Sequence, residues 1–185
     1  MNFLTMGGSV MWVLLLASIT SLSIIIERVI VYSKLTIPKG LTPFSTPADV
    51  VQALSNSSGL ETFAAFVTTH PRDEAAISLA GQTIIDTMEV RLDLLGALAK
   101  FATLLGLLGT VLGMIDTFSA ISSSNGGIDM TTLAEGLWQA LLTTAAGLSI
   151  AIPTGLALVA FEGRVARMSQ VLTLAANRIA SGGNS

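Results

Sequence analysis

Residues 137–161 read LWQALLTTAAGLSIAIPTGLALVAF, a run of 25 residues without a charged side chain. An α-helix of about 20 apolar residues crosses the ~30 Å hydrocarbon core of a bilayer. The run therefore predicts a transmembrane helix. Two more stretches predict the same: Met6 to Ile26, which has no charge, and Phe101 to Ile121, in which Asp116 lies near the far end. We expect an all-α membrane protein with three transmembrane helices.

The composition of the whole chain agrees with this and excludes several classes of function. Of 185 residues, 51% are hydrophobic and only 11% are charged, and the mean hydropathy is +0.74. The net charge of −3 argues against a nucleic-acid binder. The chain has no cysteine and one histidine, which excludes disulfide scaffolds, thiolate sites and multi-histidine metal sites. It has no phosphate-binding loop, metalloprotease motif or nucleophile elbow, so we expect neither an enzyme nor a cofactor.

The basic residues predict the orientation. All nine Lys and Arg lie between Arg28 and Lys100 or between Arg164 and Arg178. Cytoplasmic segments carry an excess of Lys and Arg, so the N-terminus is expected outside and the C-terminus in the cytoplasm. The first span is followed by Glu27-Arg28 and by no small-residue cleavage site, so we expect it to be retained.

This orientation divides the chain into six expected parts. They are a periplasmic N-terminus with the first transmembrane helix (1–27), a cytoplasmic loop (28–100), the second transmembrane helix (101–121), a periplasmic connection (122–136), the third transmembrane helix (137–161) and a cytoplasmic helical tail (162–185).

The cytoplasmic loop shows helical patterns of its own. Thr46-Pro47 predicts a helix start, and the apolar spacing around Phe63 predicts a second short amphipathic helix. From Ile77 to the end of the second span the period stays helical without a Gly/Pro cluster. The sequence therefore predicts one helix of about 45 residues there, extended into the cytoplasm. The third span likewise continues as a helix that Gly182-Gly183 ends.

Hydroxyl and small side chains follow one face of each of the last two spans. The threonines on the second span are seven residues apart: Thr103, Thr110 and Thr117. Close to them are Gly106, Gly109 and Gly113, which permit tight helix contact. The matching stripe on the third span is Ala140, Thr144, Gly147, Ala151 and Thr154 with Gly155.

Two interpretations of these stripes remain open. Membrane threonines usually bond the carbonyl at i−4, and small stripes usually mean helix packing. The alternative is a water-filled path for a proton or small cation, because a hydroxyl can both donate and accept. No ionisable side chain lies at mid-membrane depth, so this chain alone has no titrating carrier. If protons pass, a partner must supply the carboxylate.

Three further residues lie along or beside these spans. Gln139 is a candidate for lining an entrance. Asp116 is either a hydrated acid at a helix end or an ion-collecting group. Pro153 removes a backbone hydrogen bond from the third span and predicts a kink, as packing geometry or as a hinge.

Segments of all three spans resemble, in order, those of the ExbB/TolQ family. They are Gly7–Trp12 with Ile24–Arg28, Leu107–Phe118 and Gly136–Pro153. The resemblance is closer to ExbB and TolQ than to the flagellar stator MotA. It implies a homopentameric ring around a dimer of a single-span ExbD/TolR-like protein, which carries the membrane aspartate. Ion flow would turn this motor in the bacterial inner membrane and drive a TonB/TolA-like periplasmic transducer.

The same resemblance implies roles for individual residues. Thr110 and Thr144 fall on the family's two pore-facing threonines, and Thr143 is an additional hydroxyl beside them. Gln139 stands where some members have Glu, so the role of that acid is not carried over. The residues expected to set helix packing and pore geometry are Gly106, Gly109, Gly113, Gly147 and Pro153.

The function that follows is an ExbB–ExbD-like motor subunit that uses the proton motive force for outer-membrane import. One alternative is a TolQ-like or other stator subunit that powers envelope constriction or motility, with Na⁺ as the alternative ion. Another is a membrane scaffold without an ion path. In the ring, we expect the small stripes to face the interior and neighbouring subunits. Side chains of the first span expected to face lipid are Leu14, Leu15, Ile19 and Ile26.

Overall fold

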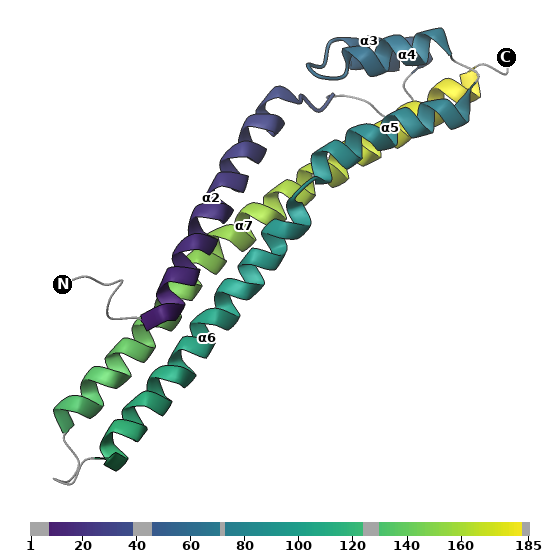
Figure 1. Ribbon diagram of the computed structural model, residues 1–185. Helices are drawn as coiled ribbons and strands as arrows, with labels where there is room; N and C mark the ends of the chain where they lie inside the picture. Colours follow the sequence, from purple (N-terminus) through teal and green to yellow (C-terminus); the bar gives the residue numbers. More distant parts are fainter. Residues whose placement is uncertain (1–7, 39–45, 71–72, 124–129, 183–185) are drawn as a thin grey trace. The chain divides into compact units, whose positions relative to one another are not determined.

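The computed structural model describes residues 8–38, 46–70, 73–123 and 130–182, and all regular structure within these ranges is helical (Figure 1). The helices are α2 (Gly8–Lys34), α3 (Pro47–Ser55), α4 (Glu61–Thr69), α5 (Glu74–Glu89), α6 (Leu92–Ser123) and α7 (Met130–Gly182). Three stretches are long and apolar enough to cross a membrane: Ser9–Lys34, Ala75–Ser123 and Met130–Ile179. The prediction of an all-α chain with three membrane-capable segments is confirmed. Residues 124–129 of the expected connection 122–136, and Gly183, lie outside the described residues.

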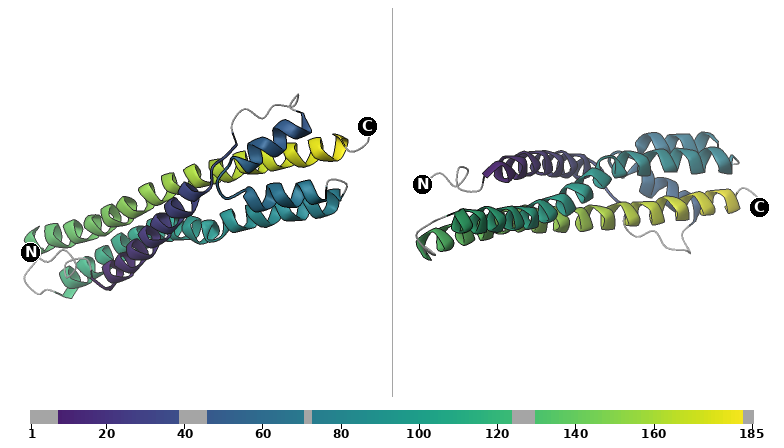
Figure 2. Two further views of the ribbon diagram at one scale, coloured as in Figure 1. Left: turned by 90° about the horizontal axis from the view of Figure 1, so that it is seen from above. Right: turned by 60° about the horizontal axis from the view of Figure 1, so that its bottom comes forward.

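The chain divides into two compact units, and the first contains the apolar helix pair. It comprises Met1–Ile25 and Asp93–Leu158. Here α6 lies alongside the first half of α7 (Figure 2), and the two run antiparallel, since Gly113 meets Ala140 while Ala102 meets Gly147. The pair is held by close approach of small residues, which membrane helices favour because lipid supplies no hydrophobic drive between them.

One side of α2 also packs in this unit. Met11 and Leu14 form a small buried cluster with Ala102 of α6. Leu14 is 1% exposed, so the prediction that it faces lipid is wrong, whereas Ile19 is 59% exposed. The helix is apolar around its whole circumference, and its sequence therefore contains no period that says which side is buried.

The second unit comprises Ile26–Leu92 and Val159–Ser185, and it contains the short helices. α3 begins with a capping box, in which the Thr46 hydroxyl accepts from the Asp49 amide (3.2 Å) and the Asp49 carboxylate accepts from the Thr46 amide (3.0 Å). The hydrogen bond that the Thr46 side chain donates to this carboxylate lowers the pKa of Asp49. The predicted helix start at Thr46-Pro47 is confirmed.

The core of this unit joins α3, α4, α5 and the end of α7. On α4, the predicted amphipathic face is buried, and Phe63 lies next to Gly81 of α5. The end of α7 buries one side along its length: Phe161, Val165, Met168, Leu172, Ala175 and Ile179. The predicted helical extension of the third span beyond Phe161 is confirmed, since α7 runs to Gly182.

The predicted helix of about 45 residues is wrong in one respect, because it is interrupted. α5 ends at Glu89, Val90 is extended (φ −45°, ψ 128°), Arg91 has φ 66°, and α6 begins at Leu92. Neither residue is a helix breaker. The interruption coincides with contacts from α2, a segment distant in sequence, which local periodicity cannot reveal.

Candidate functional site

Thr144 forms a side-chain hydrogen bond between the two helices of the pair. It is half-buried on α7, and its hydroxyl donates to the carbonyl oxygen of Gly106 on α6 at 2.7 Å. Gly106 permits this approach, since a Cβ there would lie 3.2 Å from the Thr144 Cα. The hydroxyl oxygen keeps lone pairs with which to accept a further hydrogen bond.

Thr110 lies one turn after Gly106, on the same side of α6. It is half-buried, and its hydroxyl donates to the carbonyl of Leu107 in its own helix at 2.6 Å. Thr144 thus contacts α6 directly, while helical spacing places Thr110 on the side of α6 that carries Gly106. One of the two hydroxyls is bonded within its helix and the other across to the neighbouring helix.

Thr143 has a different environment from its neighbour. It is 2% exposed, and its hydroxyl donates to the Gln139 carbonyl at 3.0 Å. Its methyl group fills the space opposite Gly109, where an added Cβ would overlap it. Within this chain Thr143 is a packing residue of the helix pair, and its hydroxyl points to its own backbone.

The glycines expected to set the packing do line the contact between α6 and α7. A Cβ on Gly113 would come within 2.9 Å of the Ala140 Cβ, and one on Gly147 within 2.5 Å of the Ala102 carbonyl oxygen. A backbone oxygen cannot move aside as a flexible side chain can. Among these glycines, Gly147 is therefore the one at which an added Cβ would meet backbone of the other helix most closely.

The remaining expected site residues lie outside this close contact. Gln139 is half-buried, one turn before Thr143, and Pro153 is exposed inside α7, which continues through it. Asp116 is exposed on α6. The apolar runs 101–115 and 137–161 contain no ionisable side chain, so the paired helices offer hydroxyls and carbonyls without a proton carrier.

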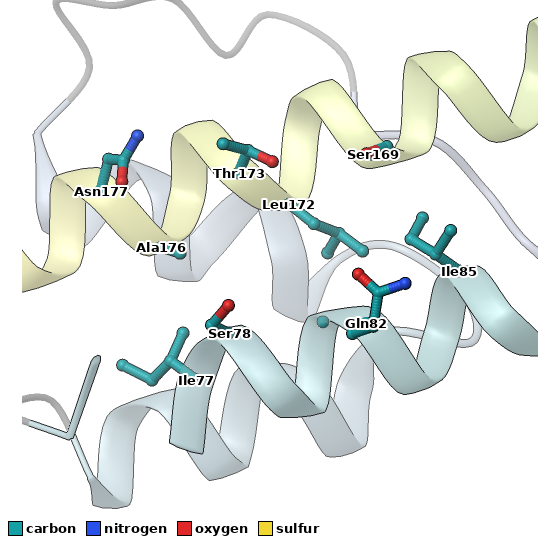
Figure 3. A pocket seen from close by; sticks show the side chains of 10 residues that line it. Ile77, Ser78, Gln82, Ile85, Ser169, Leu172, Thr173, Ala176 and Asn177 are labelled. Atoms are coloured by element: carbon teal, nitrogen blue, oxygen red, sulfur yellow. The ribbon is translucent and has the colours of Figure 1, made fainter. Parts of the chain in front are cut away.

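The second unit has an open cavity of about 140 Å³ between α5 and the end of α7 (Figure 3). Its polar lining is neutral: Ser78, Gln82, Ser169, Thr173 and Asn177. Its lining has no charged side chain, and its hydroxyl and amide groups can form hydrogen bonds. In the described part of the chain no group of His, Cys, Asp or Glu could hold a metal ion.

A polar cluster at the end of α2 was not predicted as a site. Arg28 is 4% exposed and Tyr32 is 1% exposed, and both bond to main-chain carbonyls of α5. In the sequence, Arg28 contributes to the charge distribution, to the argument for a retained first span and to the family resemblance, and none of these indicates a buried contact. A basic residue directly after an apolar span is ordinarily taken as an interface anchor, and nothing local identifies its partner.

Comparison with known proteins finds a matching family and several relatives. The sequence profile described as the MotA/TolQ/ExbB proton channel family matches residues 56–173. An ExbB-like biopolymer transport protein of Synechocystis sp. is 33% identical over 181 residues, covering 89% of this chain and 70% of that protein. The biopolymer transport protein exbB1 of Vibrio cholerae is 50% identical over 62 residues, which are 34% of this chain and 27% of that protein. The Tol-Pal system protein TolQ of Haemophilus influenzae is 35% identical over 82 residues, 44% of this chain and 36% of that protein.

Proposed function

Because the chain belongs to the MotA/TolQ/ExbB proton channel family and resembles its ExbB and TolQ members, we propose that it is the ring-forming subunit of an ion-driven motor. In its most specific form, the proposal is that the chain belongs to an ExbB–ExbD-like complex of the bacterial inner membrane. The complex uses the proton motive force to energise a TonB-like transducer for outer-membrane import. The observation that carries the proposal is the inter-helix hydrogen bond of Thr144, which lies between two apolar runs, 101–115 and 137–161, that contain no ionisable side chain.

The proposed assembly is a homopentamer around a dimer of an ExbD/TolR-like single-span protein. The apolar runs 101–115 of α6 and 137–161 of α7 contain no proton carrier, and an aspartate of the partner supplies one. An ionised carboxylate away from water is costly unless a donor faces it. The Thr144 hydroxyl is such a donor: it turns from the Gly106 carbonyl to the carboxylate, and it accepts when the acid is protonated.

The proposed orientation follows the distribution of Lys and Arg. The N-terminus and the segment 122–136 are periplasmic, and the segments 28–100 and 162–185 are cytoplasmic. In this orientation Thr110 and Thr144 lie inside the membrane, and Gln139 lies toward its periplasmic side. The path proposed for H⁺ runs along Thr110, Thr144 and Gln139. Thr143, expected beside them, packs the helix pair instead, because its hydroxyl bonds its own backbone.

The test compares Thr144→Ala with Thr144→Ser. Loss of a hydrogen bond to a charged group costs about 1.5–3 kcal/mol, or roughly 10- to 150-fold in a rate that it controls. We expect Thr144→Ala to lower proton flux by this factor and to abolish growth on a substrate that needs energised outer-membrane uptake. Thr144→Ser keeps the hydroxyl and should be mild.

Thr103→Ala is the matched control, since Thr103 is exposed on α6 and its hydroxyl donates to the Ala99 carbonyl. It should leave flux and growth unchanged. All variants must be expressed equally and purify at the wild-type mass. Normal flux through Thr144→Ala would show that the threonine only packs the helices.

The match to a TolQ protein favours a second candidate, a TolQ-like stator that powers envelope constriction. The two candidates differ in the transducer that they drive. Expression in two host strains distinguishes them. An ExbB-like chain should restore growth of a host that lacks energised uptake, and a TolQ-like chain should restore a host that lacks outer-membrane integrity. An ion flux that requires Na⁺ would identify Na⁺ as the transported ion. If the chain and its co-encoded partner together conduct no ions, the chain is a membrane scaffold without an ion path.

A further inference from the structure

The interruption between α5 and α6 is stabilised by side chains from the end of α2. Arg28 donates through Nη1 to the carbonyl oxygen of Thr87 at 3.1 Å, and the Tyr32 hydroxyl donates to that of Met88 at 2.7 Å. These two carbonyls belong to the last turn of α5, where a helix leaves its acceptors without intrahelical partners. The side chains of α2 therefore cap the end of α5.

An ion-pair chain reinforces this cap. The Glu27 carboxylate pairs with Arg28 at 2.8 Å and, through its other oxygen, with Arg91, the residue that has the positive φ. The Tyr32 ring also packs on Phe161, with ring centroids 5.1 Å apart. The cap is nevertheless incomplete, because the Arg28 Nε is buried without a hydrogen-bond partner.

The capped carbonyls are the ones that an uninterrupted helix would use. In such a helix the amides of Arg91 and Leu92 would donate to Thr87 and Met88, four residues earlier. Each carbonyl can thus bond along the helix or to a side chain of α2. The two arrangements exchange one pair of hydrogen bonds for another.

The sequence at the interruption favours the uninterrupted arrangement. Residues 82–95 contain neither Gly nor Pro, and they lie within the apolar stretch Ala75–Ser123. Arg91 instead adopts a left-handed conformation that non-glycine residues rarely take. The local sequence therefore favours a continuous helix at Arg91, whereas the cap from α2 favours the interruption.

We propose that this joint is a two-state switch, in which Arg28 and Tyr32 hold α5 and α6 apart and their withdrawal lets the two helices join. In the separated state the carbonyls of Thr87 and Met88 accept from α2. In the joined state they accept from the amides of Arg91 and Leu92, and Arg91 returns to helical φ. The proposal does not depend on ion flow or on the identity of the transducer.

The test uses two double variants of the full-length chain in lipid nanodiscs, Tyr32→Phe/Arg91→Ala and Tyr32→Phe/Arg91→Gly. Both lack the Tyr32 hydroxyl and the ion pair of Arg91, and both keep Arg28 and the aromatic contact with Phe161. They differ only in that Gly accepts a positive φ and weakens a helix, while Ala does the reverse. These preferences should change the ratio of joined to separated chains by about 30- to 150-fold between the variants.

The measurement is hydrogen exchange resolved to the single amides of residues 91 and 92. In the Ala variant we expect slower exchange at both amides than in wild type, because they become hydrogen-bonded. In the Gly variant they should exchange at least as fast as in wild type. If Arg28 and Tyr32 only stabilised a fixed structure, loss of their contacts would speed exchange in both variants. Exchange in the Ala variant that is as fast as in wild type, or faster, would therefore overturn the proposal. Tyr32→Phe alone, the mildest change, must shift exchange in the same direction as the Ala variant.

Discussion

At the scale of single residues, adjacent threonines have separate tasks. The Thr144 hydroxyl reaches a carbonyl on the neighbouring helix, whereas that of Thr143 bonds one turn back in its own helix. Side chains at adjacent positions of a helix point about 100° apart, so one can line a surface while the other fills the contact. The tandem Thr143-Thr144 therefore supplies one candidate for ion transfer and one packing residue.

Thr143→Val tests this division. Valine keeps the branched shape opposite Gly109 and removes only a hydroxyl that bonds its own backbone. We expect the free energy of unfolding in detergent to change by about 1 kcal/mol or less. Proton flux should stay within twofold of wild type. A loss of flux comparable with that of Thr144→Ala would assign Thr143 to the path instead.

At the scale of helices, the antiparallel pair α6–α7 depends on glycines that admit a neighbouring backbone. A Cβ on Gly147 would meet the Ala102 carbonyl oxygen at 2.5 Å, while one on Gly155, two turns further along α7, would meet nothing within 4 Å. Alanine otherwise stabilises a helix relative to glycine by roughly 0.5–1 kcal/mol. The same substitution should thus have opposite effects at these two positions.

We predict that Gly147→Ala destabilises the chain by about 1–3 kcal/mol, because the helices must move apart to admit the methyl group. Gly155→Ala should be neutral or stabilising. Thermal unfolding of both variants in the same detergent, followed by circular dichroism, compares them directly. Equal midpoints would mean that the helix pair can shift at no cost, contrary to a tight contact.

How much of these elements the sequence predicts depends on the range of the interactions that define them. The three apolar spans, the helix start at Thr46-Pro47 and the buried stripe on the end of α7 follow from length, capping and period. The interruption at Arg91 does not, because Tyr32 lies 56 residues and Arg28 lies 59 residues from the carbonyls that they cap. The burial of Leu14 is also not predictable, since an all-apolar helix has no distinguishable face.

The candidate site shows the same limit. The spacing and the family resemblance identify Thr110, Thr144 and the glycines of the helix contact. They do not identify the hydrogen bonds, because a threonine can bond its own helix or a neighbour at similar energy. Only the register between α6 and α7 decides that Thr144 meets the Gly106 carbonyl.

At the scale of the whole molecule, large apolar side chains remain uncovered on every membrane-capable helix. Among them are Leu16 at 64% exposed, Phe101 at 59% and Leu156 at 68%. Soluble monomers rarely leave such side chains exposed in continuous patches. The lipid of a membrane suits this surface, and in the proposed ring neighbouring subunits cover part of it.

We predict that native mass spectrometry of the complex purified with its co-encoded partner will show five copies of this chain and two of the partner. Gly109→Leu should prevent the ring from forming, because a branched side chain cannot fit opposite Thr143 and the helix pair must separate. Gly163→Ala is the control, since nothing lies within 4 Å of that position in the chain. Intact pentamers of Gly109→Leu would contradict the packing argument.

The bond from Thr144 to Gly106 also bears on how the protein enters the membrane during synthesis. The hydroxyls of Thr103, Thr110, Thr117, Thr143 and Thr154 each donate within their own helix. Each is satisfied as soon as its helix forms, so it adds little to the cost of leaving the translocon for lipid. The Thr144 hydroxyl instead finds its acceptor on α6, which is synthesised first. We therefore expect α7 to partition into the bilayer already paired with α6, so that the two helices leave the insertion machinery as one hairpin.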